Sequence, residues 1–212
     1  MLYFGQVGDI MIKTFNNGLL ESNVHIYSNN SEAMIIDCGA PISNAKQYIA
    51  QNSLTVKYIV LTHGHFDHVA FIDDYANAFP NAKIVCHEAE KTVLYNPEAN
   101  LSPYFSCEAV YDYPYTTVKH SDTLTVGDAT FKIIHTPGHT PGCISLYCKD
   151  EQIMFTGDVL FDGTYGRTDF PYGDAAQMLS SLKMLLKMDD EITFYPGHYG
   201  TSTIGQNKYL IF

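Results

Sequence analysis

Thr62-His63-Gly64-His65-Phe66-Asp67-His68 places four side chains that can bind metals within six consecutive positions. The segment follows directly on Tyr58-Ile59-Val60-Leu61, an apolar run typical of a strand that is covered on both faces. Imidazole and carboxylate groups are the ligands that zinc and related metals prefer. Alternation directs His63 and His65 to one side of the loop, while Asp67 and His68 can reach a second point nearby. Clustering these groups at a buried strand end is costly unless something ligates them, so the segment predicts a metal site whose ligands come from one stretch of chain.

Three further candidate ligands stand at the ends of predicted strands, each directly after a glycine. His139 lies in Thr136-Pro137-Gly138-His139-Thr140-Pro141-Gly142, Asp158 follows Phe155-Thr156-Gly157, and His198 follows Tyr195-Pro196-Gly197. In each case a strand delivers the chain, a glycine turns it, and a polar side chain projects into a shared cleft. Together with the first cluster they supply five histidines and two aspartates, enough for two metals with one carboxylate between them.

Hydrophobic periodicity predicts strands interspersed with helices along both halves of the chain. Strands are expected near residues 24–27, 33–36, 58–61, 83–87, 123–126, 130–135, 143–148, 152–156 and 192–195. Helices are expected over 43–52 with Ser43 as N-cap, over 69–79 up to Pro80, after His87 to about Tyr95, and after Asp174. The buried face of that last helix is expected to hold Ala175, Met178, Leu179, Leu182, Leu185 and Leu186. We therefore expect an α+β fold with two sheets face to face and helices outside, forming a single domain over residues 1–212.

Residues 96–117 break this pattern. Pro97, Pro103 and Pro114 punctuate a stretch rich in Tyr and Phe. Long loops in compact domains are often functional, and aromatic side chains suit a flap that covers substrate. A surface excursion that packs on itself is an equal alternative, and the sequence does not separate the two.

Composition limits the classes of partner. The chain has 212 residues, of which 46% are hydrophobic, and a formal net charge of −11. Twelve Lys and Arg residues form no basic patch, which argues against nucleic acid, and an acidic surface is repelled by anionic membranes. Residues 1–10 lack the pattern of a signal peptide and the five cysteines show no paired spacing, so we expect a cytoplasmic protein that acts on a small molecule. The apolar end Tyr209–Phe212 is expected in the core or in a homodimer interface.

The ligand motifs, in this order and spacing, resemble the metallo-β-lactamase superfamily. The resemblance runs from about Asn23 to Lys208. Among the branches of the superfamily it favours the short glyoxalase II-like (hydroxyacylglutathione hydrolase-like) enzymes, which share the stretches 166–171 and 203–208. It implies a four-layer αββα sandwich with the site at one edge between the sheets. It also implies one metal on His63, His65 and His139, a second on Asp67, His68 and His198, and Asp158 bridging the two.

The same resemblance implies a metal-dependent hydrolase, with a thioester as the favoured substrate and a hydroxide between the metals as nucleophile. Zinc is favoured for both divalent ions, although iron and manganese accept the same ligands. Asp67 is expected to orient the hydroxide as well as to bind metal, and is therefore the candidate catalytic residue. Arg167, Tyr165 and Tyr199 are candidate substrate contacts, but an ion pair with Asp169 is the favoured role of the arginine.

Departures from the family pattern leave several alternatives. The chain stops at Phe212, without the C-terminal helical domain whose basic residues hold glutathione in full-length glyoxalase II, so glutathione specificity is not expected. A persulfide dioxygenase of the same superfamily would use one iron, at positions matching His63, His139 and Asp158. A lactone or ester hydrolase, and a metal-binding protein without turnover, are the remaining alternatives.

Overall fold

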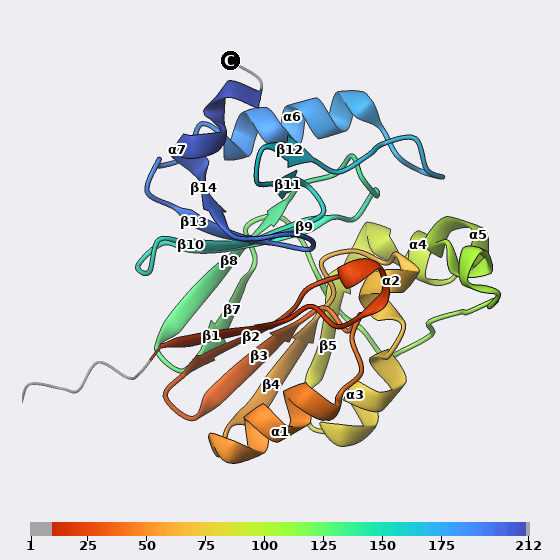
Figure 1. The fold of residues 1–212 in the computed structure, drawn as a ribbon, viewed down its shortest axis with the longest axis vertical. Helices are drawn as coiled ribbons and strands as arrows, with labels where there is room; N and C mark the ends of the chain where they lie inside the picture. The colour runs from red at the N-terminus through yellow and green to blue at the C-terminus, as the bar shows by residue number, and fades with distance from the viewer. Residues whose placement is uncertain (1–9, 211–212) are drawn as a thin grey trace, which may run out of the picture.

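The computed structural model describes residues 10–210, whose strands form two six-stranded sheets and a small hairpin (Figure 1). The first sheet has the order β1 (Met11–Phe15), β2 (Val24–Asn29), β3 (Glu32–Ile36), β4 (Thr55–Val60), β5 (Lys83–His87) and β6 (Thr116–Val118). The second has the order β14 (Ser202–Thr203), β13 (Thr193–Pro196), β10 (Ile153–Gly157), β9 (Ile144–Cys148), β8 (Ala129–His135) and β7 (Thr123–Val126). The hairpin pairs β11 (Leu160–Phe161) with β12 (Thr164–Tyr165). The prediction for residues 1–10 lies almost wholly outside the described residues, as does the part of the C-terminal prediction that concerns residues 211–212.

Strand direction decides where the polar loops meet. In the first sheet β3, β4, β5 and β6 run parallel, so β3, β4 and β5 end at one edge. In the second sheet β8 and β10 are both antiparallel to β9, and β13 is parallel to β10, so these three strands also share a direction. Segments that leave the carboxyl ends of such strands gather on one side of the sheet, which is where ligands bind in open α/β sheets.

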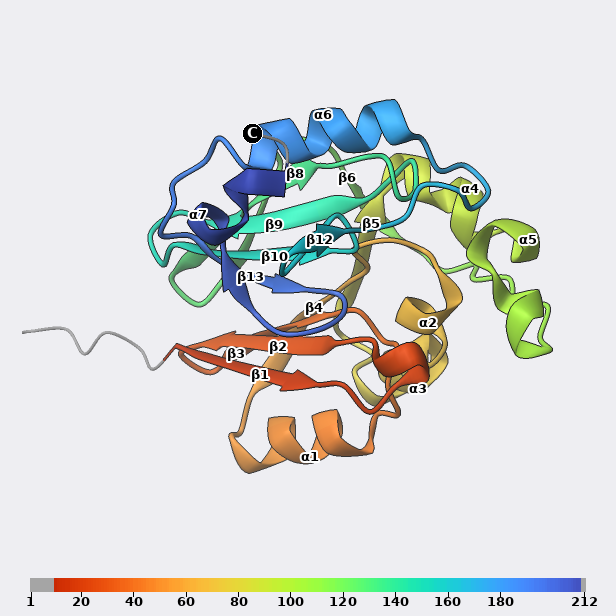
Figure 2. The ribbon, with the colours of Figure 1, turned by 45° about the horizontal axis from the view of Figure 1, so that its top comes forward.

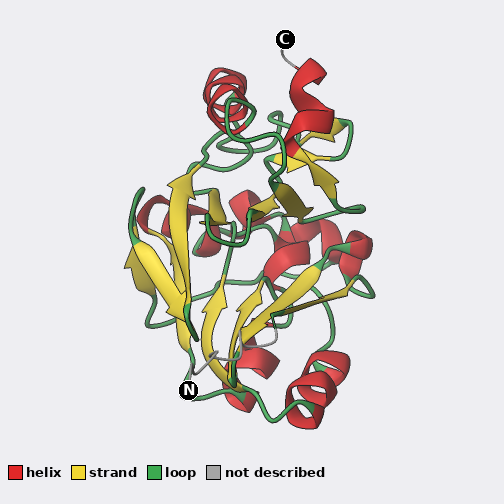
Figure 3. Cartoon of the chain, turned by 90° about the vertical axis from the view of Figure 1, so that its left-hand side faces the viewer, coloured by secondary structure: helices red, strands yellow, loops and turns green. Residues whose placement is uncertain are grey.

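Helices cover the outer faces of the two sheets. Figure 2 shows α6 (Ala175–Leu185) above the second sheet and α1 (Ser43–Gln51) below the first, and Figure 3 shows the strands through the middle with helices at either end. The shorter helices are α2 (Phe66–Val69), α3 (Ile72–Ala78), α4 (Lys91–Leu94), α5 (Pro97–Asn100) and α7 (Ile204–Asn207). Within residues 10–210, no helix combines the length and hydropathy needed to cross a bilayer.

Three apolar cores separate the four layers. On β3, Ala33 and Ile35 pack towards α1 and α3, while Met34 and Ile36 pack towards the second sheet, because successive side chains of a strand alternate between its faces. Between the sheets, large rings meet edge to face, with the centroids of Tyr27 and Phe131 4.7 Å apart. A third core joins the second sheet to α6. The predicted αββα sandwich is therefore confirmed.

The helix expected over 69–79 begins later than predicted. It is observed as α3, whereas Val69 ends the separate helix α2, which lies in the predicted ligand loop, and Ala70 and Phe71 stand between the two. The loop after β3 causes the break, because the amide of Cys38 donates to the His68 carbonyl at 2.7 Å and the Phe71 amide donates to the Cys38 carbonyl at 3.1 Å. The His68 carbonyl is thus bonded outside the helix instead of to the amide four residues on. The helix predicted after His87 is likewise short, with a 3-10 turn over Glu88–Glu90 followed by α4.

Two details of the helix predictions were wrong. Ile42, rather than Ser43, is the N-cap of α1, because the Lys46 amide donates to the Ile42 carbonyl and the helix already includes Ser43. On α6, Leu179 is 43% exposed although it was predicted on the buried face. The buried residues of α6 are Met178, Ser181, Leu182 and Leu185, a narrower stripe that leaves Leu179 and Ala175 towards solvent.

The cap of α6 gives a direct test of this local structure. The Asp174 Oδ1 atom accepts hydrogen bonds from the amides of Ala176 at 2.8 Å and Gln177 at 3.0 Å. Asp174→Ala removes both acceptors and should lower the free energy of unfolding by about 1 kcal/mol in urea titrations. Asp174→Asn keeps a side-chain oxygen and should stay close to the unmodified protein. Equal midpoints for the alanine variant and the unmodified protein would show that the cap contributes nothing.

Candidate metal centre

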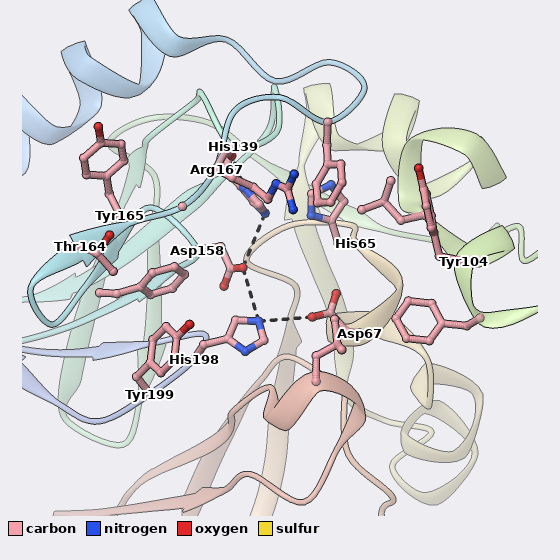
Figure 4. A pocket seen from close by; sticks show the side chains of 16 residues that line it. His65, Asp67, Tyr104, His139, Asp158, Thr164, Tyr165, Arg167, His198 and Tyr199 are labelled. Atoms are coloured by element: carbon pink, nitrogen blue, oxygen red, sulfur yellow. Dashed lines mark hydrogen bonds and ion pairs between the residues drawn. The ribbon is translucent and has the colours of Figure 1, made fainter.

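Strand ends from both sheets deliver all seven predicted ligands to one place. Figure 4 shows the five of them that line the cavity, His65, Asp67, His139, Asp158 and His198. His63 to His68 follow β4, and His139, Asp158 and His198 follow β8, β10 and β13. The ligand atoms of His63, His65 and His139 lie within 4.8 Å of one another, and so do those of Asp67, His68 and His198. These are the two groups that the sequence resemblance implied.

Asp158 lies between the two groups. Its Oδ2 atom is 3.6 Å from His139 Nε2 and 3.5 Å from His198 Nε2, and its Oδ1 atom is 3.4 Å from His68 Nε2. One carboxylate therefore adjoins histidines of both groups. The dashed lines of Figure 4 follow this sequence from His139 through Asp158 and His198 to Asp67.

Unpartnered buried atoms show that this donor set fits metal ions. The Nε2 atoms of His63, His65 and His139 and the Oδ1 atom of Asp158 are buried and have no hydrogen-bond partner among residues 10–210. Such orphaned groups are costly in a folded protein unless something ligates them. Nitrogen and carboxylate donors in this number suit two ions of the zinc, iron or manganese type.

Hydrogen bonds behind the site fix which nitrogen of each histidine faces inward. His139 Nδ1 lies 2.7 Å from the Arg167 carbonyl, which can only accept, so Nδ1 carries the proton and Nε2 offers a lone pair. His68 Nδ1 is 3.0 Å from Asp37 Oδ2 and is held in the same way. The hydroxyl of Thr62 donates to Asp37 Oδ2 at 2.8 Å and can accept from His63 Nδ1 at 3.1 Å.

Burial and charge give the two groups different electrostatics. Burial, together with neighbouring imidazoles, lowers the pKa of His63 and of His65, and burial likewise lowers the pKa of His139, so these rings stay neutral and can ligate. Burial also opposes protonation of His68, but the carboxylates of Asp158, Asp67 and Asp37 outweigh it and raise its pKa to about 10. The second group therefore stabilises positive charge.

Two buried carboxylates that the sequence analysis did not single out support the ligand loops. Asp37 follows β3 directly and accepts from the Thr62 amide at 2.7 Å as well as from the groups described above. Glu90 follows β5 and is completely buried. Its Oε1 atom accepts from the Gly64 amide at 2.7 Å, and its Oε2 atom accepts from the Gly142 amide at 2.7 Å and the Thr140 hydroxyl at 2.8 Å. The available signal was a carboxylate shortly after a predicted strand. That signal points to the site only once β3, β4 and β5 are known to be parallel and to end at the same edge of the sheet.

Close approach explains two of the glycines that precede ligands. A Cβ atom on Gly197 would lie 2.1 Å from Asp158 Oδ1 and 2.7 Å from His68 Cε1. Gly157 has φ +53°, and its Cβ would lie 2.7 Å from the Thr62 side chain. Both positions therefore exclude a side chain for steric reasons, as the predicted strand-glycine-ligand arrangement requires.

A cavity of about 660 Å³ opens beside the ligands. Its lining includes the three predicted substrate contacts, Arg167, Tyr165 and Tyr199. The Arg167 guanidinium also makes the predicted ion pair, with two bonds of 2.7 Å to Asp169. In the 96–117 segment, Leu101, Tyr104 and Phe105 line the cavity, while residues 109–115 pack on the core beneath the first sheet.

Comparisons with known proteins agree with this geometry. Residues 17–198 match the family model described as the metallo-beta-lactamase superfamily. The hydroxyacylglutathione hydrolase GloC of Haemophilus influenzae is 35% identical over 197 residues, which cover 86% of this chain and 87% of that protein. The crystal structure of the BLEG-1 B3 metallo-beta-lactamase superposes with a TM-score of 0.85 at 32% identity, covering 92% of this chain and 95% of the other. That of TTHA1623 in a di-iron-bound form superposes with a TM-score of 0.81 at 27% identity, covering 93% and 99%.

Substitution of Glu90 tests whether it positions the histidine group. In Glu90→Gln one oxygen becomes an amide nitrogen, which must face the amide of Gly64 or of Gly142 as a second donor. We expect the free energy of unfolding to fall by about 1–3 kcal/mol. Because the displaced loops carry His63, His65 and His139, zinc affinity should also fall, by at least tenfold for one of two bound ions in a competition titration with a chromogenic chelator.

The exposed neighbour gives a matched control. Glu88 has a side chain 62% exposed and, within residues 10–210, pairs with Lys119 alone at the surface, so Glu88→Gln should change neither quantity. Loss of stability in Glu90→Gln with unchanged affinity for both zinc ions would limit Glu90 to holding the fold.

Proposed function

We propose that this protein, which belongs to the metallo-beta-lactamase superfamily, is a metal-dependent hydrolase that acts on thioesters. One observation carries the proposal: two groups of ligand-type side chains, joined by Asp158, lie against a cavity that is large enough for a small molecule. In hydrolysis the oxygen of water bonds to the acyl carbon and the carbon–sulfur bond breaks, which yields a carboxylic acid and a thiol.

His63, His65 and His139 would hold one divalent ion, and Asp67, His68 and His198 would hold the other, with Asp158 in contact with both. Zinc is the proposed metal, and iron or manganese would accept the same donors. When bound, two such ions supply an acidified water and polarise the substrate carbonyl.

Asp67 is the side chain proposed to act on the reacting water. It lines the cavity, and its Oδ2 atom is 3.3 Å from His198 Nε2. The interaction with His68, followed by that with His198, lowers its pKa against the effect of burial, so it is an ionised acceptor at neutral pH. It can therefore accept a hydrogen bond from one proton of the water, while a lone pair of the water oxygen faces the acyl carbon.

The rest of the lining supports a thioester over an amide as substrate. Among the described residues, no serine or cysteine lines the cavity, so the chain offers no such nucleophile there. Apart from the proposed ligands, its titratable side chains are Arg167 and three tyrosines, all very weak acids. An amine must be protonated as it leaves, whereas a thiolate, with a pKa of about 8.5 for a cysteine-like thiol, leaves without help.

The proposed activity is tested by counting metal and measuring turnover on the same preparation. We expect about two metal ions per chain by elemental analysis, and hydrolysis of S-lactoylglutathione or of an N-acetylcysteamine thioester that a chelator abolishes and zinc restores. One iron per chain with oxygen uptake on a persulfide, and no thioester hydrolysis, would contradict the proposal in favour of a dioxygenase.

Substitution of Asp67 tests its proposed part. Asp67→Asn should lower kcat by about 100-fold or more, because the amide is a poorer acceptor for the water proton and a poorer ligand. Asp73→Asn changes an exposed carboxylate on α3 in the same way and should leave kcat unchanged. A fully metallated Asp67→Asn protein with unchanged kcat would remove Asp67 from the proposed mechanism.

A further inference from the structure

We infer that the cavity takes an uncharged thioester with an apolar, preferably aromatic, group on each side of the scissile bond, and not the thioester of an anionic thiol such as glutathione. That the scissile bond is a thioester rests on the proposed function. The preference for apolar and uncharged groups rests on the cavity alone.

Two apolar walls flank the proposed ligands. In Figure 4, Tyr104 lies on one side of His65 and Asp67, whereas Thr164, Tyr165 and Tyr199 lie on the other side, beyond Asp158 and His198. The first wall comes from the 96–117 segment and the second from the β11–β12 hairpin and the loop after β13. A bond held at the ligands therefore has one apolar wall on either side of it.

Ring pairs define the shape of both walls. The centroid of the lining residue Phe105 is 5.0 Å from that of Phe66, which packs on the core, and the centroids of the lining residues Tyr104 and Phe170 are 6.4 Å apart. On the opposite side, Phe161 and Tyr199 meet edge to face at 5.5 Å. Rings arranged in this way offer faces and edges to a further aromatic group, a contact that is stronger than burial of its area alone.

The apolar side chains around the opening are exposed. Tyr104 is 76% exposed, Tyr199 is 72% exposed, and Leu20, which also lines the cavity, is 67% exposed. Large apolar side chains gathered around one hollow, and not scattered over the surface, indicate a site that a ligand covers. Burial of these groups would supply the binding free energy.

Charge argues against an anionic arm. Among the described residues that line the cavity, Arg167 is the only Lys or Arg. Its Nε and Nη2 atoms both bond to Asp169, and its guanidinium lies 4.0 Å from the centroid of the Phe170 ring. The carboxylates of a glutathione arm would therefore have to compete with Asp169 for the one cation of the lining, on a chain whose net charge is −11.

Binding of thioethers tests the preference independently of catalysis. Dibenzyl sulfide, benzyl methyl sulfide and S-benzylglutathione carry a thioether in place of the thioester, with no acyl group on the sulfur, and cannot be hydrolysed there. Their dissociation constants for the zinc-loaded protein can be measured from tyrosine fluorescence, since the chain has 16 Tyr and no Trp. We expect dibenzyl sulfide to bind at least tenfold more tightly than either of the other two.

One variant for each wall locates the binding. Tyr104→Ala and Tyr165→Ala should each weaken dibenzyl sulfide about 2- to 10-fold, which is the range expected from the loss of one aromatic contact. Tyr209→Ala removes a tyrosine of similar exposure, 65%, that does not line the cavity, and should change nothing. S-benzylglutathione binding as tightly as dibenzyl sulfide, or equal binding by all four proteins, would overturn the inference.

Parallel hydrolysis assays separate this inference from the proposed function. Preference for dibenzyl sulfide in a protein that hydrolyses no thioester would overturn the function and support the apolar cavity. Thioester hydrolysis with tighter binding of S-benzylglutathione would overturn the apolar cavity and support the function. With both proposals right, phenylacetyl thioesters of benzyl mercaptan should have the higher kcat/KM, by about tenfold over S-lactoylglutathione.

Discussion

Three hydrogen bonds to the buried Glu90 carboxylate join the parts of the chain on which the site depends. Glu90 enters from the end of β5, Gly64 lies in the loop after β4, and Thr140 and Gly142 belong to the turn that follows β8 in the other sheet. Backbone amides can only donate, so a single acceptor with two oxygens fixes both loops against each other. Asp37 does the same within the first sheet, between Thr62 and His68. Two carboxylates without access to solvent thereby set the geometry of histidines that come from both sheets.

This framework produces a cluster that a metal-free protein would accommodate poorly. Burial keeps the imidazole rings of the first group neutral, and His139 carries its proton on Nδ1, away from the centre of the group. In the second group, the carboxylates around His68 favour positive charge. The first group therefore has ligand atoms without partners, and the second group has an excess of negative charge. Two bound cations would satisfy both.

Much of this arrangement could be predicted from local sequence, and the exceptions have physical reasons. Strand ends carrying His63, His139, Asp158 and His198 were visible because apolar runs followed by glycine and a polar residue are local signals. The hydrogen bond between Glu90 and Gly142 could not be predicted, because it depends on contact between two sheets, which no local pattern specifies. The break between α2 and α3 was missed for the same reason, since the amide of Cys38 competes for the His68 carbonyl from a distant loop. Leu179 shows the limit of periodicity, which gives the direction of a buried stripe but not its width.

We propose that two ions bind to the two side-chain groups joined by Asp158. Anomalous diffraction from crystals of the zinc-loaded protein, collected on both sides of the zinc absorption edge, would locate them. We expect two anomalous peaks in each chain, one among His63, His65 and His139 and one among Asp67, His68 and His198, each adjoining Asp158. A single peak, or peaks outside these groups, would contradict the proposal.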